Sequence, residues 1–266
     1  MDADGRSRTR QVGSFASVVL CDNPGQLELE GTNTWVLAGP EAAQCVVVDP
    51  GPAGHRAHLD AVVAAARPRV GLVLVTHGHH DHVGGVADFV ARTGAPVRAF
   101  SPDQCRAAEP LRDEEVFEAA GIRFTVLHTP GHTPDSVSLL AECGSERAVL
   151  TGDTVLGTGT SLLDDDADAL RAYLSSLERL AAVGAGRLFP GHGPDHPELA
   201  PVVREYQRHR EQRLAQIRGY LRASGLAAQD ADPRAVAQAV YTDIPAELMD
   251  AAVVSVRAQL AYLVSR

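Results

Sequence analysis

The sequence has few cysteines, few aromatic side chains and no long apolar run. Its four cysteines are far apart and form no CxxC pair. We therefore expect no sulfur-based metal site, and this spacing is typical of a protein in a reducing compartment. Aromatic residues make up only 5% of the chain, which argues mildly against a groove that stacks single-stranded nucleic acid.

Signals for export or membrane insertion are also missing from the sequence. Residues 1–10 carry charges with no apolar stretch behind them, and no run of about eighteen apolar residues occurs anywhere. We therefore predict a cytoplasmic protein with no membrane partner. The formal net charge of −10 disfavours nonspecific binding of long nucleic acid through counterion release, although a local basic patch would still allow RNA as a partner.

Strand-like and helix-like segments alternate through most of the chain, and with 45% hydrophobic residues among 266 it can bury a large core. Strands are predicted at residues 35–38, 45–48, 71–75, 97–99, 122–127, 137–140, 148–150 and 187–189. Helices are predicted at 58–66, 85–92 and 167–183, the last preceded by three aspartates suited to an N-cap. This alternation predicts a layered α/β architecture.

The composition changes after residue 197. Residues 198–266 are rich in Ala, Leu, Gln, Arg and Glu, and they predict helices at 199–224, 233–241 and 245–265. Apolar residues at helical spacing predict a small core that these helices share. We therefore divide the chain into a catalytic domain, 1–197, and a small helical domain, 198–266, which would act as a structural cap or support a homodimer.

The run from Thr76 to His82 (THGHHDH) directly follows an apolar strand-like stretch. Three candidate imidazole ligands and a carboxylate gathered in six residues would be costly to desolvate unless a cation compensated them. His77 and His79 are two apart and can reach one ion, whereas Asp81 and His82 begin the next helix and point toward a second. The run therefore predicts a metal site.

Three more candidate ligands each follow a strand-like segment. The full set is His77, His79, Asp81, His82, His132, Asp153 and His192. Imidazole nitrogen and carboxylate oxygen without thiolate favour zinc, with iron or manganese as alternatives. Seven ligands exceed the needs of one tetrahedral ion, so we expect two ions, and Asp153 can bridge them if it lies between them.

The order of these residues resembles the metallo-β-lactamase superfamily, whose pattern is HxHxDH followed by separate His, Asp and His, and the match spans roughly residues 15–195. The resemblance assigns His77, His79 and His132 to one ion, Asp81, His82 and His192 to the other, and Asp153 to the bridge. It also implies an αββα sandwich with the ligands at one edge. Histidine at position 79, where glutamate would indicate a di-iron branch, favours the hydrolytic branch.

Further segments resemble one subgroup, the β-lactamase-like protein 2 group and its bacterial relatives. They are GTNTW at 31–35, VDPG at 48–51, TPGHTPDS at 129–136 and TGDTVLGTGT at 151–160, with a helical tail after His192. In that group the tail is winged-helix-like, a single-strand endoribonuclease activity is known, and related members act as acyl-carrier-protein thioesterases. The resemblance implies the chemistry more firmly than the substrate.

The predicted chemistry is hydrolysis by a hydroxide that two zinc ions share, with Asp81 or Asp153 orienting it as a catalytic carboxylate. No GxSxG segment indicates a serine nucleophile instead. Three functions stay open. The favoured one is hydrolysis of a small or carrier-linked ester, thioester or lactone; the others are a nuclease or phosphodiesterase acting on single-stranded RNA, and a nucleic-acid-binding regulatory protein that the metal only stabilises.

Residues outside the ligand set carry expectations of their own. His80 breaks the ligand spacing and should point away from the metals, whereas His58 and His209 are interpreted as surface or helix residues. Asp49 ends a buried strand and should orient a ligand-bearing loop. Substrate contacts could come from residues 21–34, from Thr154, Thr158, Thr160 and Ser161, from Tyr206, or from a basic stripe of Arg204, Arg208, His209, Arg210, Arg213 and Arg218.

Overall fold

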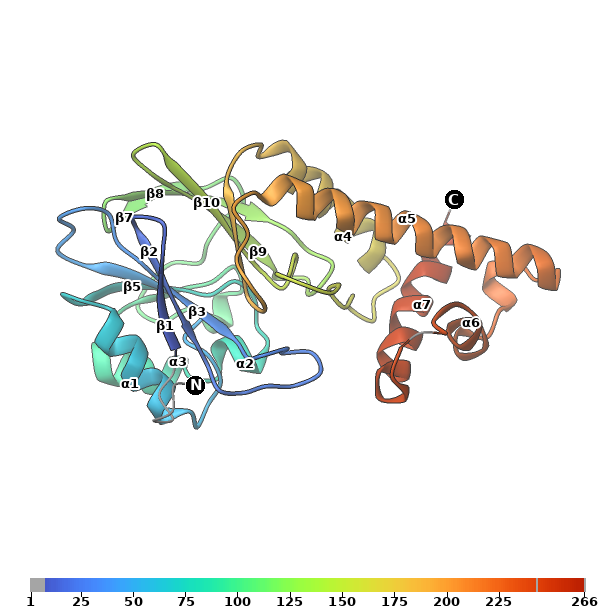
Figure 1. The fold of residues 1–266 in the computed structure, drawn as a ribbon, viewed down its shortest axis with the longest axis horizontal. Helices are drawn as coiled ribbons and strands as arrows, with labels where there is room; N and C mark the ends of the chain where they lie inside the picture. The colour runs from blue at the N-terminus through green and yellow to red at the C-terminus, as the bar shows by residue number, and fades with distance from the viewer. Residues whose placement is uncertain (1–7, 243, 266) are drawn as a thin grey trace.

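The computed structural model describes residues 8–242 and 244–265. Residues 1–7 lie outside this described part. They belong to residues 1–10, for which we predicted no export signal. Two β-sheets lie face to face with helices outside them, and a further group of helices extends from one end (Figure 1). The αββα sandwich implied by the resemblance is thereby confirmed.

The first sheet has six strands in the order β1-β2-β3-β4-β5-β6. They are β1 (Arg8–Val12), β2 (Ala16–Leu20), β3 (Asn33–Leu37), β4 (Cys45–Val48), β5 (Val70–Leu74) and β6 (Val97–Arg98). The outer face of this sheet packs on α1 (Arg56–Ala65) and α3 (Val86–Thr93). Because β4, β5 and β6 run parallel, the segments that follow them leave the same edge of the sheet.

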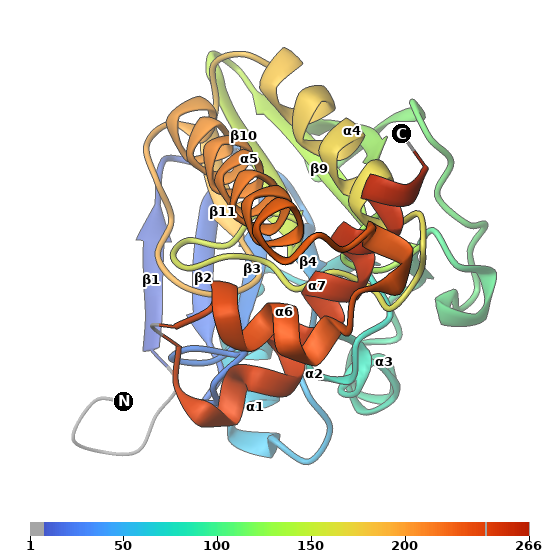
Figure 2. The same ribbon diagram turned by 90° about the vertical axis from the view of Figure 1, so that its right-hand side faces the viewer.

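The second sheet has five strands in the order β11-β10-β9-β8-β7. They are β7 (Val116–Ala119), β8 (Ile122–His128), β9 (Val137–Cys143), β10 (Glu146–Gly152) and β11 (Arg187–Pro190). α4 (Ala169–Ala182) and α5 (Leu199–Ser224) lie over its outer face (Figure 2). β10 and β11 are parallel, so the segments after them also emerge at one edge.

Apolar side chains from both sheets form the core between them. Trp35 of β3 stacks on Phe189 of β11 with ring centroids 4.0 Å apart, and its Nε1 donates to the carbonyl of Pro190 at 3.0 Å. The Asn33 side chain donates to the carbonyls of Pro190 and Gly193 at 3.1 and 2.8 Å. These bonds hold the two sheets together at the edge where β11 ends.

The described part of the C-terminal region consists of helices joined by short connecting segments. α5 is followed by α6 (Pro233–Val240) and α7 (Met249–Val264), with short 3-10 turns at Ala228–Asp230 and Ala246–Leu248. The three helices share an apolar cluster that includes Ile217, Val236 and Val256, as helical spacing predicted. The winged-helix detail and the domain division at residue 197 stay predictions.

Strands and helices predicted from the sequence agree with the structure within a few residues. The strands β1, β2 and β7, the 3-10 turn at Pro102–Gln104 and the four-residue helix α2 (His80–Val83) were not predicted. β1 contains four polar residues among five, so its pattern does not indicate a buried strand. No helix in the described part of the chain is long and apolar enough to cross a membrane, and all four cysteines are free.

Candidate metal centre

Ligand-bearing segments from both sheets meet at one edge of the sandwich. His77 and His79 lie in the loop after β5, and Asp81 and His82 lie in α2, which follows that loop. The other three candidates come from the second sheet. His132 lies between β8 and β9, Asp153 follows β10, and His192 follows β11.

The seven predicted ligands form two adjoining groups. One contains His77, His79, His132 and Asp153, the other contains Asp81, His82 and His192, and within each group the ligand atoms lie within 4.8 Å of one another. His79 Nδ1 is 3.1 Å from His77 Nε2 and 2.9 Å from His132 Nε2. His192 Nε2 is 3.3 Å from His82 Nε2 and 3.1 Å from Asp81 Oδ2. Imidazole nitrogens at this spacing are suited to a shared cation.

Asp153 lies between the two groups. Its Oδ2 is 3.7 Å from His132 Nε2 and 3.2 Å from His192 Nε2. Its Oδ1 is buried and has no hydrogen-bond partner, which is unusual for a carboxylate oxygen inside a protein. Gly191 permits this approach, because a Cβ there would collide with Asp153 Oδ1.

Asp49 orients one histidine of each group. Its Oδ2 accepts from His82 Nδ1 at 2.8 Å and from the Thr76 hydroxyl at 2.7 Å. The same hydroxyl is 3.0 Å from His77 Nδ1, so Asp49 reaches His77 through Thr76. With Nδ1 as the donor in both rings, each Nε2 keeps its lone pair for the centre of the site. This arrangement agrees with the orienting role predicted for Asp49.

Backbone carbonyls orient two more of the imidazoles. His132 Nδ1 donates to the carbonyl of Leu162 at 2.9 Å and lies 3.3 Å from the Ser161 hydroxyl. His192 Nδ1 donates to the carbonyl of Gly31 at 3.0 Å. The sequence could not have indicated these partners, because a carbonyl carries no side-chain signal.

The charges at this edge favour a bound cation. Burial works against protonation of His192, but Asp153 and Asp81 raise its pKa to about 9. His82 is likewise opposed by burial, yet Asp153 and Asp49 raise its pKa well above the ordinary value. Buried carboxylates therefore call for positive charge here. A divalent cation meets this need, and Asp153 Oδ1, which accepts no hydrogen bond and lies 3.4 Å from His82 Nε2, offers it a ligand atom. The residues therefore fit a metal.

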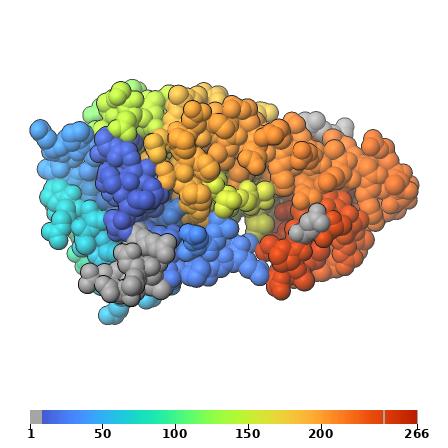
Figure 3. Space-filling model, in the orientation of Figure 1, coloured from blue at the N-terminus to red at the C-terminus, as the bar shows by residue number. Residues whose placement is uncertain are grey.

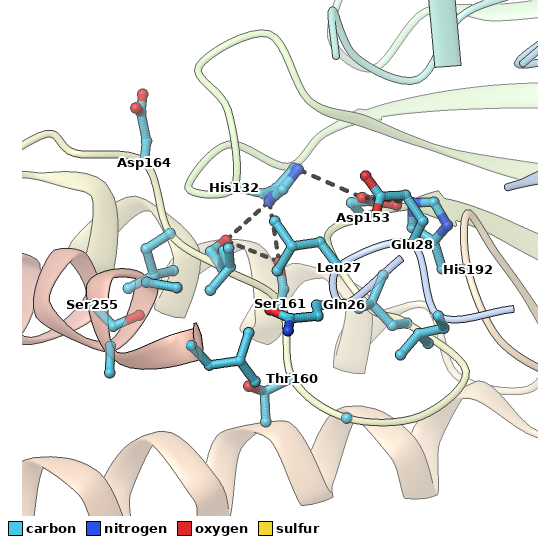
Figure 4. A pocket seen from close by; sticks show the side chains of 18 of the residues that line it. Gln26, Leu27, Glu28, His132, Asp153, Thr160, Ser161, Asp164, His192 and Ser255 are labelled. Carbon is cyan, nitrogen blue, oxygen red and sulfur yellow. Dashed lines mark hydrogen bonds and ion pairs between the residues drawn. The ribbon is translucent and has the colours of Figure 1, made fainter. Parts of the chain in front are cut away.

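A cavity of about 770 Å³ opens beside these groups and extends to the C-terminal helices. Figure 4 shows His132, Asp153 and His192 at one end of it, with Leu27 and Ser161 along its sides and Ser255 farther off. The exposed His80 also lies on the wall, outside both ligand groups. Cavities of this kind are the usual place for a small-molecule substrate.

Several other sequence predictions can be compared with this cavity. Its lining includes residues 26–29 and, among the threonines and serines named above, Thr158, Thr160 and Ser161. Thr154 is fully buried and bonds to Thr129. Thr32, which was not singled out, donates to Asp81 Oδ2 at 3.2 Å.

The predicted basic stripe divides in two. His209, Arg210 and Arg213 line the cavity, whereas Arg204, Arg208 and Arg218 are exposed and lie outside its lining. Tyr206 is buried rather than placed over the opening, and its hydroxyl accepts from the Leu156 amide at 2.9 Å. His58 lies in α1 as predicted for a helix residue, but it is buried and not at the surface.

Comparison with known proteins gives the class of this fold and site. The model of the metallo-β-lactamase superfamily matches residues 27–192. A β-lactamase domain protein from Burkholderia ambifaria has a similar structure, with a TM-score of 0.81 over 98% of this chain and 89% of that one, at 18% sequence identity. The chain belongs to the metallo-β-lactamase superfamily and is a hydrolase of that class.

Two curated relatives narrow the resemblance. The chain is 32% identical to a β-lactamase-like protein 2 homolog of Drosophila melanogaster over 96% of this chain and 89% of the relative. It is 34% identical to an atrochrysone carboxyl ACP thioesterase of Aspergillus fumigatus, over 87% of this chain and 75% of the relative. The predicted resemblance to the β-lactamase-like protein 2 group is confirmed.

Proposed function

We propose that this protein is a dinuclear zinc hydrolase of a small or carrier-linked ester, thioester or lactone. The observation that carries the proposal is the arrangement of seven ligand side chains in two groups with Asp153 between them, at the end of a cavity. Nitrogen and oxygen donors without thiolate favour zinc, although iron or manganese would suit the same donors.

Each ligand group would hold one ion. His77, His79 and His132 would bind the first, Asp81, His82 and His192 the second, and Asp153 would bridge them. Metal ions bound there supply Lewis acidity and a water of lowered pKa. Asp81 and Asp153 are the carboxylates that we assign to orient the attacking water by accepting its hydrogen bond. With a thioester, a C–O bond forms, the C–S bond breaks and the thiol leaves with a proton.

The lining of the cavity supports an acyl substrate. Aliphatic side chains such as Leu29, Leu163 and Leu248 form much of its wall, and apolar walls with a few polar groups are usual in sites for small molecules. The relative from Aspergillus fumigatus is named as an ACP thioesterase, which supports a carrier-linked substrate. We retain a cytoplasmic location and a homodimer as predictions.

Cleavage of single-stranded RNA is the second candidate function. Arg210 and Arg213 on the cavity wall favour it, because a phosphate backbone needs nearby positive charge. The net charge of −10 opposes it. A purely regulatory role is the least supported, since a metal that only stabilises a fold needs no adjoining cavity.

A parallel assay separates these functions. The zinc-loaded protein would be compared with chelator-stripped protein on an acyl thioester, a lactone, bis-nitrophenyl phosphate and a labelled RNA oligomer. We expect zinc-dependent hydrolysis of the thioester or lactone, restored when zinc is added back. Cleavage of RNA or the phosphodiester alone would favour the nuclease, and full activity after stripping would refute the metal mechanism.

A further inference from the structure

The cavity at the ligand groups continues well beyond the sandwich. It passes Ser161 and reaches the C-terminal helices, where Ser255 of α7 lines it (Figure 4). The space-filling view shows the surface hollowed between the blue N-terminal part and the red C-terminal helices (Figure 3). A volume of about 770 Å³ falls within the roughly 300–1,000 Å³ of sites for drug-sized ligands. An acetyl group would leave most of it unfilled.

We propose that the C-terminal helices form the binding site for a long apolar acyl group and that the start of α7 sets the preferred chain length. The carbonyl to be cleaved would lie at the ligand groups, and the acyl chain would extend past Ser161 toward α7. This inference rests on the proposed function, because it specifies the acyl part of the substrate for the same site.

The walls beyond the ligands are contributed by three separate segments. Leu27 and Leu29 come from the segment between β2 and β3, and Leu163 comes from the segment after β10. Leu248 directly precedes α7, and Ala251 lies in its first turn. Leu27 leaves 48% of its surface exposed beside the cavity. An apolar ligand would cover these side chains, and removing them from water is favourable.

The basic residues of the wall are already engaged within the protein. Arg210 donates to the carbonyl of Ser161, and Arg213 donates to the carbonyl of Val240 at 3.0 Å. Burial lowers the pKa of His209 to about 4, so this side chain is neutral at pH 7. The three basic residues therefore supply two positive charges at pH 7, and both guanidinium groups are held in place by carbonyls of the protein.

Acidic residues also lie on the same wall. Glu28 and Asp164 both line the cavity outside the ligand groups. Their carboxylates would repel the phosphates of a nucleic acid, whereas an uncharged acyl chain is indifferent to them. Charge and apolar lining together favour the acyl group over RNA at this end of the cavity.

The same wall contacts a metal-ligand candidate. Arg210 on α5 holds the carbonyl of Ser161, and the Ser161 hydroxyl lies 3.3 Å from His132 Nδ1. An acyl chain that follows the wall therefore begins beside His132. This continuity places the variable part of the substrate next to the carbonyl that the site would attack.

A series of substrates with different acyl lengths tests the proposal, together with substitutions of Ala251 that fill the cavity. Zinc-loaded full-length protein would hydrolyse the acetyl, hexanoyl and dodecanoyl thioesters of N-acetylcysteamine. Because each buried methylene adds to binding, kcat/KM should rise at least about tenfold from acetyl to dodecanoyl. Ala251→Phe, which fills the wall, should reduce the ratio of dodecanoyl to acetyl kcat/KM by about tenfold, and Ala251→Val should lie in between.

Ala261→Phe is the matched control. Ala261 lies on the same helix, is half-buried as Ala251 is, and does not line the cavity. This variant should keep the wild-type chain-length profile. A flat profile in the wild type, or the same profile in all three variants, would overturn the proposal while leaving the hydrolase function intact.

A binding measurement separates this proposal from the proposed function. The thioether S-dodecyl N-acetylcysteamine cannot be hydrolysed, and calorimetry would measure its Kd with wild type, Ala251→Phe and Ala261→Phe. We expect at least about tenfold weaker binding to Ala251→Phe only. If the thioether binds in this pattern but no thioester is cleaved, the acyl site stands and the thioesterase function fails. Equal affinity for both variants would overturn the acyl site. So would N-acetylcysteamine, which lacks the dodecyl chain, if it bound as tightly as the thioether.

Discussion

At the ligand end of the cavity, four of the five imidazoles are held by buried hydrogen bonds through the nitrogen that faces away from the site. At the far end, much of the wall consists of aliphatic side chains such as Leu248 and Ala251, which make no directional bonds. The first region therefore fixes atoms in position, and the second fixes only a volume.

The two regions should respond differently to substitution. A buried hydrogen-bonded network loses several partners when one member is removed, and each unsatisfied group then carries a desolvation cost. An aliphatic wall tolerates changes that keep its volume. In this fold, then, the reaction depends on a few irreplaceable side chains, while substrate preference can change by small steps at the C-terminal helices.

Replacing a ligand should give the largest effect. His132→Ala removes Nε2 from the first ligand group, so turnover should fall by several orders of magnitude and bound zinc should decrease. Steady-state kinetics and elemental analysis would measure both. His55→Ala is the control, because His55 makes no capping hydrogen bond at α1. Unchanged turnover in His132→Ala would contradict the assignment.

Acid should lower the free energy of unfolding by protonating the buried side chain of His58. This side chain is buried, its Nε2 lies 2.9 Å from the Thr34 hydroxyl, and burial lowers its pKa from 6.5 to about 4. The unfolded chain therefore binds more protons between these two pH values, so the stability from neutral His58 is complete above about pH 6.5 and is lost as the pH falls toward 4. At about 1.4 kcal/mol per pKa unit, the loss approaches about 3 kcal/mol.

His58→Gln isolates this contribution. Glutamine can donate to Thr34 but does not titrate in this range. Denaturant unfolding of both proteins at pH 7 and pH 4.5 would give the free energies, and the wild type should lose more stability than the variant. Equal losses in the two proteins would show that His58 keeps an ordinary pKa.

Removing the charge of Asp49 should have a somewhat smaller effect. Asp49→Asn weakens the bonds to His82 and, through Thr76, to His77. Asparagine fits the space and tolerates the positive φ of 54° at this position. Partners behind metal ligands contribute roughly 10–100-fold to affinity or activity. Competition with a chromogenic chelator would measure the zinc affinity, and an unchanged value would exclude an orienting role.

The smallest effect is expected where the C-terminal helices meet the sandwich through an ion pair. Arg257 and Asp165 are 2.6 Å apart, and each side chain is 53% exposed. Solvent screens such a pair, so Arg257→Gln should change the free energy of unfolding by less than about 1 kcal/mol. Urea unfolding provides the measurement. A loss comparable to that of a buried group would show that this contact anchors the helices.

The ligand set could be predicted because each member follows a strand with a recognisable pattern. The apolar runs before Thr76 and His192 predict buried strands, and parallel strands bring their following loops to one edge. The supporting contacts are different. Gly31 and Leu162 act through backbone carbonyls, and any residue type could provide them, so their roles could not be predicted.

The part of the cavity wall at the start of α7 also escaped prediction. Ala251 and Leu248 have the spacing of ordinary helix residues, and their pattern favours a helical core over a ligand site. His58 carries the same ambiguity, because a histidine on a helix gives no sign of whether its face is covered.

The sequence by itself determined a layered α/β architecture and the seven candidate ligands, because strand periodicity and ligand spacing are local properties of the chain. The αββα arrangement was implied only by the resemblance to the metallo-β-lactamase superfamily. The tertiary structure alone decided which atoms face each other, that Asp49 supports both ligand groups, and that the C-terminal helices complete the cavity. These features depend on contacts between residues far apart in the chain, such as Arg210 with Ser161 and His192 with Gly31. Such contacts arise only when separate elements pack together, and no local pattern encodes them.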